Sequence, residues 1–177
     1  APAFRALWDQ VNDQRFLAYA LKAVDESNTV YLKKPMGSLE LGQSIRSAEA
    51  FLNRMEAYAL SGEEGLALAE LNAFRKTRVI GYTDVNLSGQ ALLDEIRLER
   101  RKELCFEGHR WFDLRRQGMP EIKHTYKAEK GGAVYEYVLQ QGDPMYTLPF
   151  PNSVVLQNRA LVQNPSREMG ARQGEIQ

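Results

Sequence analysis

The sequence contains very little cysteine and histidine, which limits the chemistry that the chain can carry. Cys105 is the only cysteine among 177 residues, so no disulfide can form within the chain. Its place inside a predicted helix favours a small packed side chain over a nucleophile. His124 has no second histidine or cysteine close to it, whereas a zinc site needs three or four converging ligands. We therefore predict no metal site and no cofactor.

An excess of charge of one sign is absent as well. The 23 basic and 23 acidic residues cancel to a formal net charge of zero, and the densest charged stretch, 94–116, mixes both signs. Because nucleic-acid binding needs a basic surface, we expect no nucleic-acid partner. No run of apolar residues is long enough for a membrane span, and no signal peptide is visible. The chain begins at Ala1 without methionine, so we expect a fragment or a processed product.

The clearest helical period in the chain runs from Leu92 to Arg116. At about 100° per residue, one face of this helix combines apolar and charged side chains: Leu92, Leu93, Ile96, Arg100, Glu103, Glu107, Trp111 and Leu114. Buried charges are costly unless they are paired, and the i,i+3 spacing offers the pairs Arg100–Glu103 and Glu107–Arg110. We predict an arginine–glutamate network along a packed helix. Gly108 permits a break or bend, followed by a second helical piece over 110–116.

A catalytic pair of carboxylates is the alternative interpretation of Glu103 and Glu107. Carboxyl groups at i and i+4 lie about 6 Å apart on a helix, near the separation found in glycosidases. A glycosidase acid needs a raised pKa, however, and neighbouring arginines favour the ionised form of a carboxyl group. A di-metal site would need Glu-x-x-His, and Phe106 stands three residues before His109. The structural network is therefore favoured over both kinds of site, and we predict no catalytic residue.

The first part of the chain has weaker periodicity. We expect a short helix over about 4–11, while 15–24 fits a strand or a helix equally well, and 28–35 alternates as a strand ended by Pro35. Packing is the default role for the aromatic side chains here, with ligand stacking as the alternative: Trp8, Tyr19 and Tyr31.

Two helices follow, joined by a short turn. The first is predicted over about 41–60 with Gly62 at its end, and the second over 66–75. Their apolar stripes are Ile45, Ala48, Leu52, Met55 and Ala59 in the first and Ala67, Leu71 and Phe74 in the second. The small residues between them resemble one tetratricopeptide unit, and a second unit could begin with the helix after Ser88, a predicted N-cap. The segment 79–88 is predicted to be a loop.

The last third of the chain changes to strand and turn patterns. Residues 122–128 and 133–140 flank a glycine-rich turn and predict a β-hairpin. Prolines spaced through 146–165 predict an extended segment with one helical turn near 153–156. Residues 166–177 are polar and are expected to be loose. Together these patterns predict a mainly α fold with tetratricopeptide-like helical hairpins, a small β-hairpin and an irregular, extended C-terminal segment.

The stretch ERRKELCFEGHRWFDLRRQG, residues 99–118, resembles the signature of the SusD/RagB family of outer-membrane nutrient-binding lipoproteins. The matching residues are Glu99, Arg100, Glu103, Leu104, Phe106, Glu107, Gly108, Arg110, Trp111, Phe112, Asp113, Leu114, Arg116 and Gly118. A second family pattern is similar near the end of the chain, at Leu148, Pro149, Pro151, Asn158, Leu161, Gln163, Asn164 and Pro165. The chain departs from it at Val155, where glutamate is usual, and at Ser166 and Arg167, where glycine and tyrosine are usual.

The resemblance implies that residues 1–165 correspond to the C-terminal part of a longer SusD-like domain. Its expected parts are a helical hairpin over 41–75, the signature helix over 88–116, the hairpin over 122–140 and a C-terminal wrap over 146–165. We also expect an incomplete domain whose upstream part supplies further helices and a lipid anchor.

The function implied by the resemblance is binding of glycans or other nutrients at the cell surface. Such proteins are anchored in the outer membrane by lipid and deliver oligosaccharide to a TonB-dependent transporter, without catalysis. No ligand-binding residue is carried over from the family. The signature residues are assigned to structure: Arg100, Glu103, Glu107, Gly108, Arg110, Trp111 and Asp113. A tetratricopeptide-type scaffold that binds a peptide or protein remains the alternative, and a glycoside hydrolase is the third hypothesis.

Overall fold

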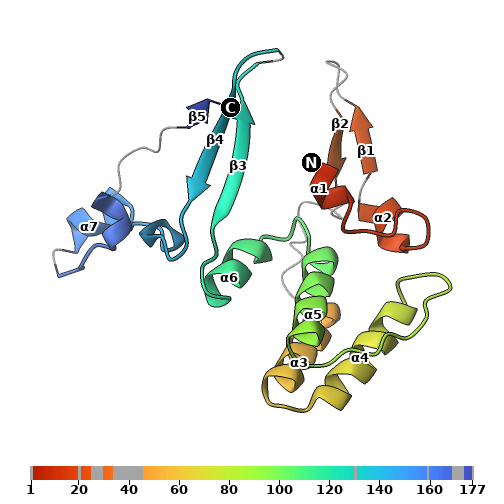
Figure 1. Ribbon diagram of the computed structural model, residues 1–177. Helices are drawn as coiled ribbons and strands as arrows, with labels where there is room; N and C mark the ends of the chain where they lie inside the picture. Colours follow the sequence, from red (N-terminus) through yellow and green to blue (C-terminus); the bar gives the residue numbers. More distant parts are fainter. Residues whose placement is uncertain are drawn as a thin grey trace. The chain divides into compact units, whose positions relative to one another are not determined.

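The computed structural model describes residues 2–19, 21–24, 30–33, 46–129, 131–158, 160–168 and 174–176 (Figure 1). The chain divides into two units, residues 1–109 and 110–177, which are described separately. Among the described residues, the first unit contains helices and a two-stranded antiparallel sheet, and the second combines short helices with a three-stranded antiparallel sheet. The predicted mainly α fold with a small β component is confirmed, while its likeness to tetratricopeptide repeats stays a prediction.

Three helices form the centre of the first unit: α3 (Ser47–Leu60), α4 (Glu64–Lys76) and α5 (Gly89–Glu103). Helix α3 packs against both α4 and α5, as Figure 1 shows. The apolar stripes predicted from the sequence meet here in one core: Ala48, Leu52, Met55, Ala67, Leu71, Phe74, Leu92, Ile96 and Leu104. Several of these side chains have no exposed surface, and burying each leucine, isoleucine or methionine contributes about 1.5–3 kcal/mol.

The boundaries of these helices follow local turn chemistry. Gly62, with φ of +87°, lies in the turn after α3, as its sequence position predicts. The start of α3 differs from the prediction, because Arg46 is extended at φ −119° and ψ 136° and the helix begins at Ser47. Residues 41–45 of the predicted helix, including Ile45, lie outside the described residues. Ser88 occupies the N-cap position of α5, but its side chain makes no capping hydrogen bond.

The N-terminal part of this unit differs from the sequence-based expectation. The helix predicted over about 4–11 is shorter and begins earlier, as α1 (Pro2–Arg5). The chain then turns, because the Asp9 carboxylate accepts hydrogen bonds from the backbone amides of Val11 and Asn12 at 3.0 Å. The ambiguous stretch 15–24 contains both structures, α2 (Gln14–Tyr19) and β1 (Leu21–Val24). Strand β2 (Val30–Lys33) pairs antiparallel with β1, from Leu21↔Lys33 to Val24↔Val30. Pro35, its predicted end, lies outside the described residues.

The signature helix is interrupted earlier than the break predicted at Gly108, so Glu107 lies in a turn and not on the helix face. Helix α5 ends at Glu103, and α6 (His109–Arg116) begins after a tight turn in which Phe106 has φ of +62° and Gly108 has φ of +82°. Such left-handed conformations are easily adopted by glycine and are costly for other residues. Phe106 is held in place by an edge-to-face contact with Phe4, with the ring centroids 5.7 Å apart.

Replacing Gly108 by alanine should therefore lower the free energy of unfolding by about 1–2 kcal/mol. A Cβ atom at this position would meet no atom within 4 Å, so the cost is conformational and not steric. Gly65→Ala is the matched control, because Gly65 also has free space around it but lies in helix α4, where alanine is favoured over glycine. Urea unfolding of both variants provides the measurement, and a Gly108→Ala variant as stable as Gly65→Ala would contradict the expected backbone strain.

The second unit contains a three-stranded antiparallel sheet in the order β3-β4-β5. The predicted hairpin is confirmed: β3 (Ile122–Lys127) pairs with β4 (Val134–Leu139), from Ile122↔Leu139 to Lys127↔Val134. The expected loose end of the chain is wrong for β5 (Glu175–Ile176), which pairs with Tyr135 and Glu136 of β4. Two residues are too few to show the alternation of apolar and polar side chains that indicates a strand, so the sequence does not predict β5.

The rest of this unit consists of short turns and helices. A 3₁₀ turn, η1 (Pro144–Tyr146), is capped by the Asp143 side chain, which accepts the amide of Met145 at 2.8 Å. Helix α7 (Asn152–Gln157) contains the helical turn predicted at 153–156, and η2 (Pro165–Glu168) follows. The buried Tyr146 stacks on Trp111 with their ring centroids 4.9 Å apart.

Candidate functional site

The buried face of α5 carries two carboxylates that contact arginines from distant parts of the chain. Glu99 and Glu103 are 1% and 0% exposed. Arg15, itself buried, reaches both of them: its Nη2 lies 2.6 Å from Glu99 Oε1, and its Nη1 lies 3.0 Å from Glu103 Oε2. The same guanidinium donates to Asp13 at 2.9 Å, so that one arginine connects three carboxylates.

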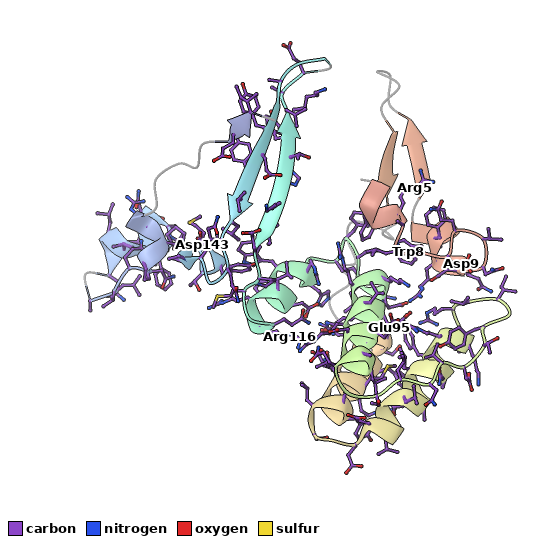
Figure 2. All side chains as sticks on the ribbon, viewed as in Figure 1. Arg5, Trp8, Asp9, Glu95, Arg116 and Asp143 are labelled. Atoms are coloured by element: carbon purple, nitrogen blue, oxygen red, sulfur yellow. The ribbon has the colours of Figure 1, made fainter. Side chains whose placement is uncertain are left out.

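Three further arginines complete this arrangement, which we call the Glu99–Glu103 cluster. Arg75 Nε lies 2.8 Å from Glu99 Oε2, and Arg75 Nη2 also contacts Glu95, which Figure 2 labels on α5. Arg78 Nε lies 3.1 Å from Glu103 Oε2, and Arg46 Nη2 lies 2.6 Å from Glu103 Oε1. Arg46 also pairs with Glu107. The full set is Asp13, Arg15, Arg46, Arg75, Arg78, Glu95, Glu99, Glu103 and Glu107.

The electrostatics of the cluster keep its two central carboxylates ionised. Burial by itself would raise the pKa of Glu99, but the charges of Arg15 and Arg75 outweigh it and hold that pKa below its ordinary value. Burial likewise opposes ionisation of Glu103, and the hydrogen bond and charge of Arg78, together with those of Arg15, lower its pKa. A general acid needs the opposite shift. The cluster therefore suits joining segments of the fold and does not suit proton donation.

The signature residues predicted from the sequence take several different positions. Arg100 is buried and donates from Nη1 to Asn53 Oδ1 at 2.7 Å, and its Nη2 lies 3.6 Å from Glu49. Glu103 and Glu107 belong to the cluster, and Gly108 makes the turn after α5. In the second unit, Arg110 is exposed, Trp111 stacks on Tyr146, and the buried Asp113 pairs with Arg116 at 3.0 Å. The intrahelical pairs Arg100–Glu103 and Glu107–Arg110 and the structural role of these residues stay predictions.

Sequence reasoning missed the arginines that occupy the cluster. Arg15, Arg46, Arg75 and Arg78 stand in three separate segments, none with a motif around it. The one available signal was indirect, because the predicted buried face of α5 held carboxylates that needed cationic partners. Among the aromatic candidates, Trp8 is buried beneath the Arg15 guanidinium, 5.5 Å from its ring centroid, so packing describes its role. The side chains of Tyr19 and Tyr31 lie outside the described part of the chain.

A groove of about 370 Å³ lies between α3 and α4. Apolar side chains form its floor, and a charged pair spans its mouth: Arg54 Nη2 of α3 lies 2.7 Å from Glu70 Oε1 of α4. The Arg54 guanidinium also covers the Phe51 ring at 5.0 Å, and Phe51 is 47% exposed. The lining residues are Ser47, Ala48, Phe51, Arg54, Met55, Glu70, Ala73, Phe74, Thr77 and Arg78.

A second hollow, of about 270 Å³, lies within the second unit beside the β-hairpin. Its lining contains no Asp, Glu, Lys or Arg and is mainly apolar: Trp111, Ile122, His124, Tyr137, Val138, Leu139, Met145 and Leu148. His124 faces Tyr137 across the hairpin. Within the described ranges, no group of three or more His, Cys, Asp or Glu side chains has the arrangement of a metal site. Among the same residues, no helix is both long enough and apolar enough to cross a bilayer.

Comparison with known families and structures gives matches to the SusD family and to solved SusD-like proteins. Residues 10–166 match the model of the SusD family. A SusD-like carbohydrate binding protein from Bacteroides vulgatus ATCC 8482 superposes with a TM-score of 0.61 at 24% identity, over 90% of this chain and 40% of that protein. A SusD superfamily protein from Bacteroides fragilis gives a TM-score of 0.62 at 29% identity, over 84% and 33%.

A SusD-like protein from Bacteroides fragilis NCTC 9343 gives a TM-score of 0.52 at 27% identity, over 68% of this chain and 25% of that protein. The chain thus spans 40% or less of the length of each of these three proteins. No curated protein matches the sequence.

Proposed function

This chain belongs to the SusD family, and we propose from that membership that it takes part in binding oligosaccharides or related nutrients and delivering them to a TonB-dependent transporter. The observation that carries the proposal is the family match over 10–166, which includes the whole signature. SusD-family proteins bind carbohydrate for nutrient uptake and are associated with the outer membrane. A lipid anchor on the whole protein is part of the proposal.

Binding without bond cleavage is the second part of the proposal. It is supported by the electrostatics of Glu103, which contacts three arginines and whose pKa is lowered by Arg78 and Arg15. A carboxylate held in this way can neither donate a proton at neutral pH nor approach a glycosidic oxygen. The cluster is therefore assigned to holding α5 against α2, the start of α3 and the end of α4.

Isothermal titration calorimetry with starch, plant and host oligosaccharides tests the proposal. We expect at least one class to bind with a Kd on the order of 1 mM or below, since the costs of association leave modest affinity for a small polar ligand. Chromatography of the same mixtures should recover the oligosaccharides unchanged. Absence of binding throughout the panel would contradict the binding role, and cleavage that Glu107→Gln abolishes would contradict the non-catalytic role.

A protein-interaction scaffold is the alternative function, and the groove between α3 and α4 is the observation that favours it. Pairs of antiparallel helices present grooves that accept an amphipathic helix through side chains at i, i+3, i+4 and i+7. Capture of a helical peptide in the absence of any oligosaccharide binding would support this function.

A further inference from the structure

The groove between α3 and α4 combines an apolar floor with a mouth that both donates and accepts hydrogen bonds. Met55 and Ala48 are buried in its floor, and the half-exposed Phe51 stands at its side. Arg54 offers guanidinium N–H groups at the mouth, and Glu70 offers carboxylate oxygens. The exposed fractions of these two side chains are 50% and 24%, so solvent and ligands can reach both.

The charges around the groove are balanced. Arg54 and Glu70 neutralise one another, and Arg78, another lining residue, is paired with Glu103. Among the described lining residues, no uncompensated charge is therefore present to attract an ionic ligand. A hydroxyl group is at once a donor and an acceptor, and a fixed arginine–glutamate pair satisfies both functions. Neutral molecules that carry several hydroxyl groups and an apolar ring face have the complementary chemistry.

From these features we infer that the groove between α3 and α4 is a subsite for neutral pyranose rings of an oligosaccharide. In this arrangement the apolar face of a ring packs on Phe51, and ring hydroxyl groups bond to Arg54 and Glu70. The inference rests on the proposed function and adds to it the position of the subsite and the neutral character of its ligand. The volume of about 370 Å³ falls at the lower end of small-molecule sites, which suits one or two sugar rings.

The geometry favours a short ligand over a helix. An α-helix is about 10 Å wide and needs an apolar channel open along several turns. The Arg54–Glu70 pair joins α3 to α4 across the mouth through two contacts, 2.7 Å and 3.1 Å long. A docked helix would have to displace this pair, whereas a sugar ring can bond to it where it stands.

Three single variants of the chain test the subsite. Phe51→Ala removes the packing surface, and Glu70→Gln removes the charged acceptor while keeping the side-chain shape. Asp84→Asn is the matched control, because Lys76 and Asp84 also form an exposed ion pair, 2.7 Å long, involving α4, and neither residue lines the groove. Each such pair contributes little to stability, so differences in binding will not reflect unfolding. Circular dichroism checks that each variant is folded.

The probes are maltohexaose and xylohexaose, titrated by calorimetry. We expect Phe51→Ala to weaken binding about tenfold and Glu70→Gln about fivefold, while Asp84→Asn stays within about twofold of the unaltered chain. As an independent readout, amide chemical shifts of residues 51, 54 and 70 in the unaltered chain should move on titration.

Three other outcomes would each overturn the inference, and they differ in what they mean for the proposed function. If the oligosaccharides bind with equal affinity to all variants, the subsite is overturned and the proposed function stands with its site elsewhere. If an amphipathic helical peptide moves these amide signals and the sugars do not, the groove is a peptide site and the inference is overturned. If neither sugar binds, the inference is overturned, and the wider panel described above decides whether the proposed function fails with it.

Discussion

Replacing Glu103 by glutamine is expected to lower the free energy of unfolding by about 3–5 kcal/mol. Glu103 has no exposed surface and contacts Arg15, Arg46 and Arg78. Without the charge of Glu103, the Arg15 guanidinium loses one of its carboxylate partners. Water cannot replace that partner, because the Arg15 side chain is only 4% exposed. Arg46 and Arg78 are 23% and 27% exposed and can turn partly to solvent, so the main cost falls on Arg15.

The matched control for this variant is Asp94→Asn, which removes a carboxylate from an exposed position of the same helix. Its effect should stay below about 0.5 kcal/mol. Urea unfolding followed by circular dichroism measures both variants, and the double variant Arg15→Met/Glu103→Gln should cost less than the sum of its single changes. Equal midpoints for Glu103→Gln and Asp94→Asn would show that the cluster does not hold the first unit together.

The stability of the chain should also fall steeply in acid. The pKa values of Glu99 and Glu103 lie below the ordinary glutamate value in the folded protein, so at low pH the unfolded chain binds more protons than the folded one. The stabilisation from these two carboxylates is therefore complete above about pH 5 and is lost as the pH falls through their lowered pKa values. Each of them contributes a slope of up to about 1.4 kcal/mol per pH unit in that window.

Urea midpoints measured between pH 7 and pH 2.5 test this expectation. The Glu103→Gln variant lacks one of the two titrating groups, and its slope in acid should be smaller by about one proton. Hydrogen bonds from Asn12 and Val11 lower the pKa of Asp9 too. Asp9 is present in both proteins, so its titration contributes equally to both curves. Parallel curves for the variant and the unaltered chain would show that Glu103 is not the group that titrates.

Local pattern was sufficient for most of the helices and for the hairpin. The buried stripes of α3 and α4 repeat at helical spacing, and Gly62 adopts the positive φ that its position after α3 predicts. The hairpin β3–β4 follows from two alternating segments around a glycine-rich turn. These features depend on residues a few positions apart, where backbone geometry links sequence spacing directly to structure.

Local sequence patterns do not predict features that depend on residues far apart in the chain. Strand β5 pairs through its backbone, and a two-residue segment carries no recognisable period. The groove between α3 and α4 depends on Arg54 and Glu70, which are 16 positions apart and meet because the two helices pack side by side. Their side chains would be equally acceptable as solvated surface residues on either helix alone.

The sequence by itself determined that α5 is a packed helix with charged side chains on its buried face, because the apolar period and the positions of the glutamates are local properties. Which cations satisfy those glutamates was decided by the tertiary structure. Arg15 and Arg46 lie 88 and 57 positions from Glu103, and only the folding of the first unit brings their guanidinium groups to its carboxylate. The energy of a buried charge demands a partner, but it does not specify from which segment the partner comes.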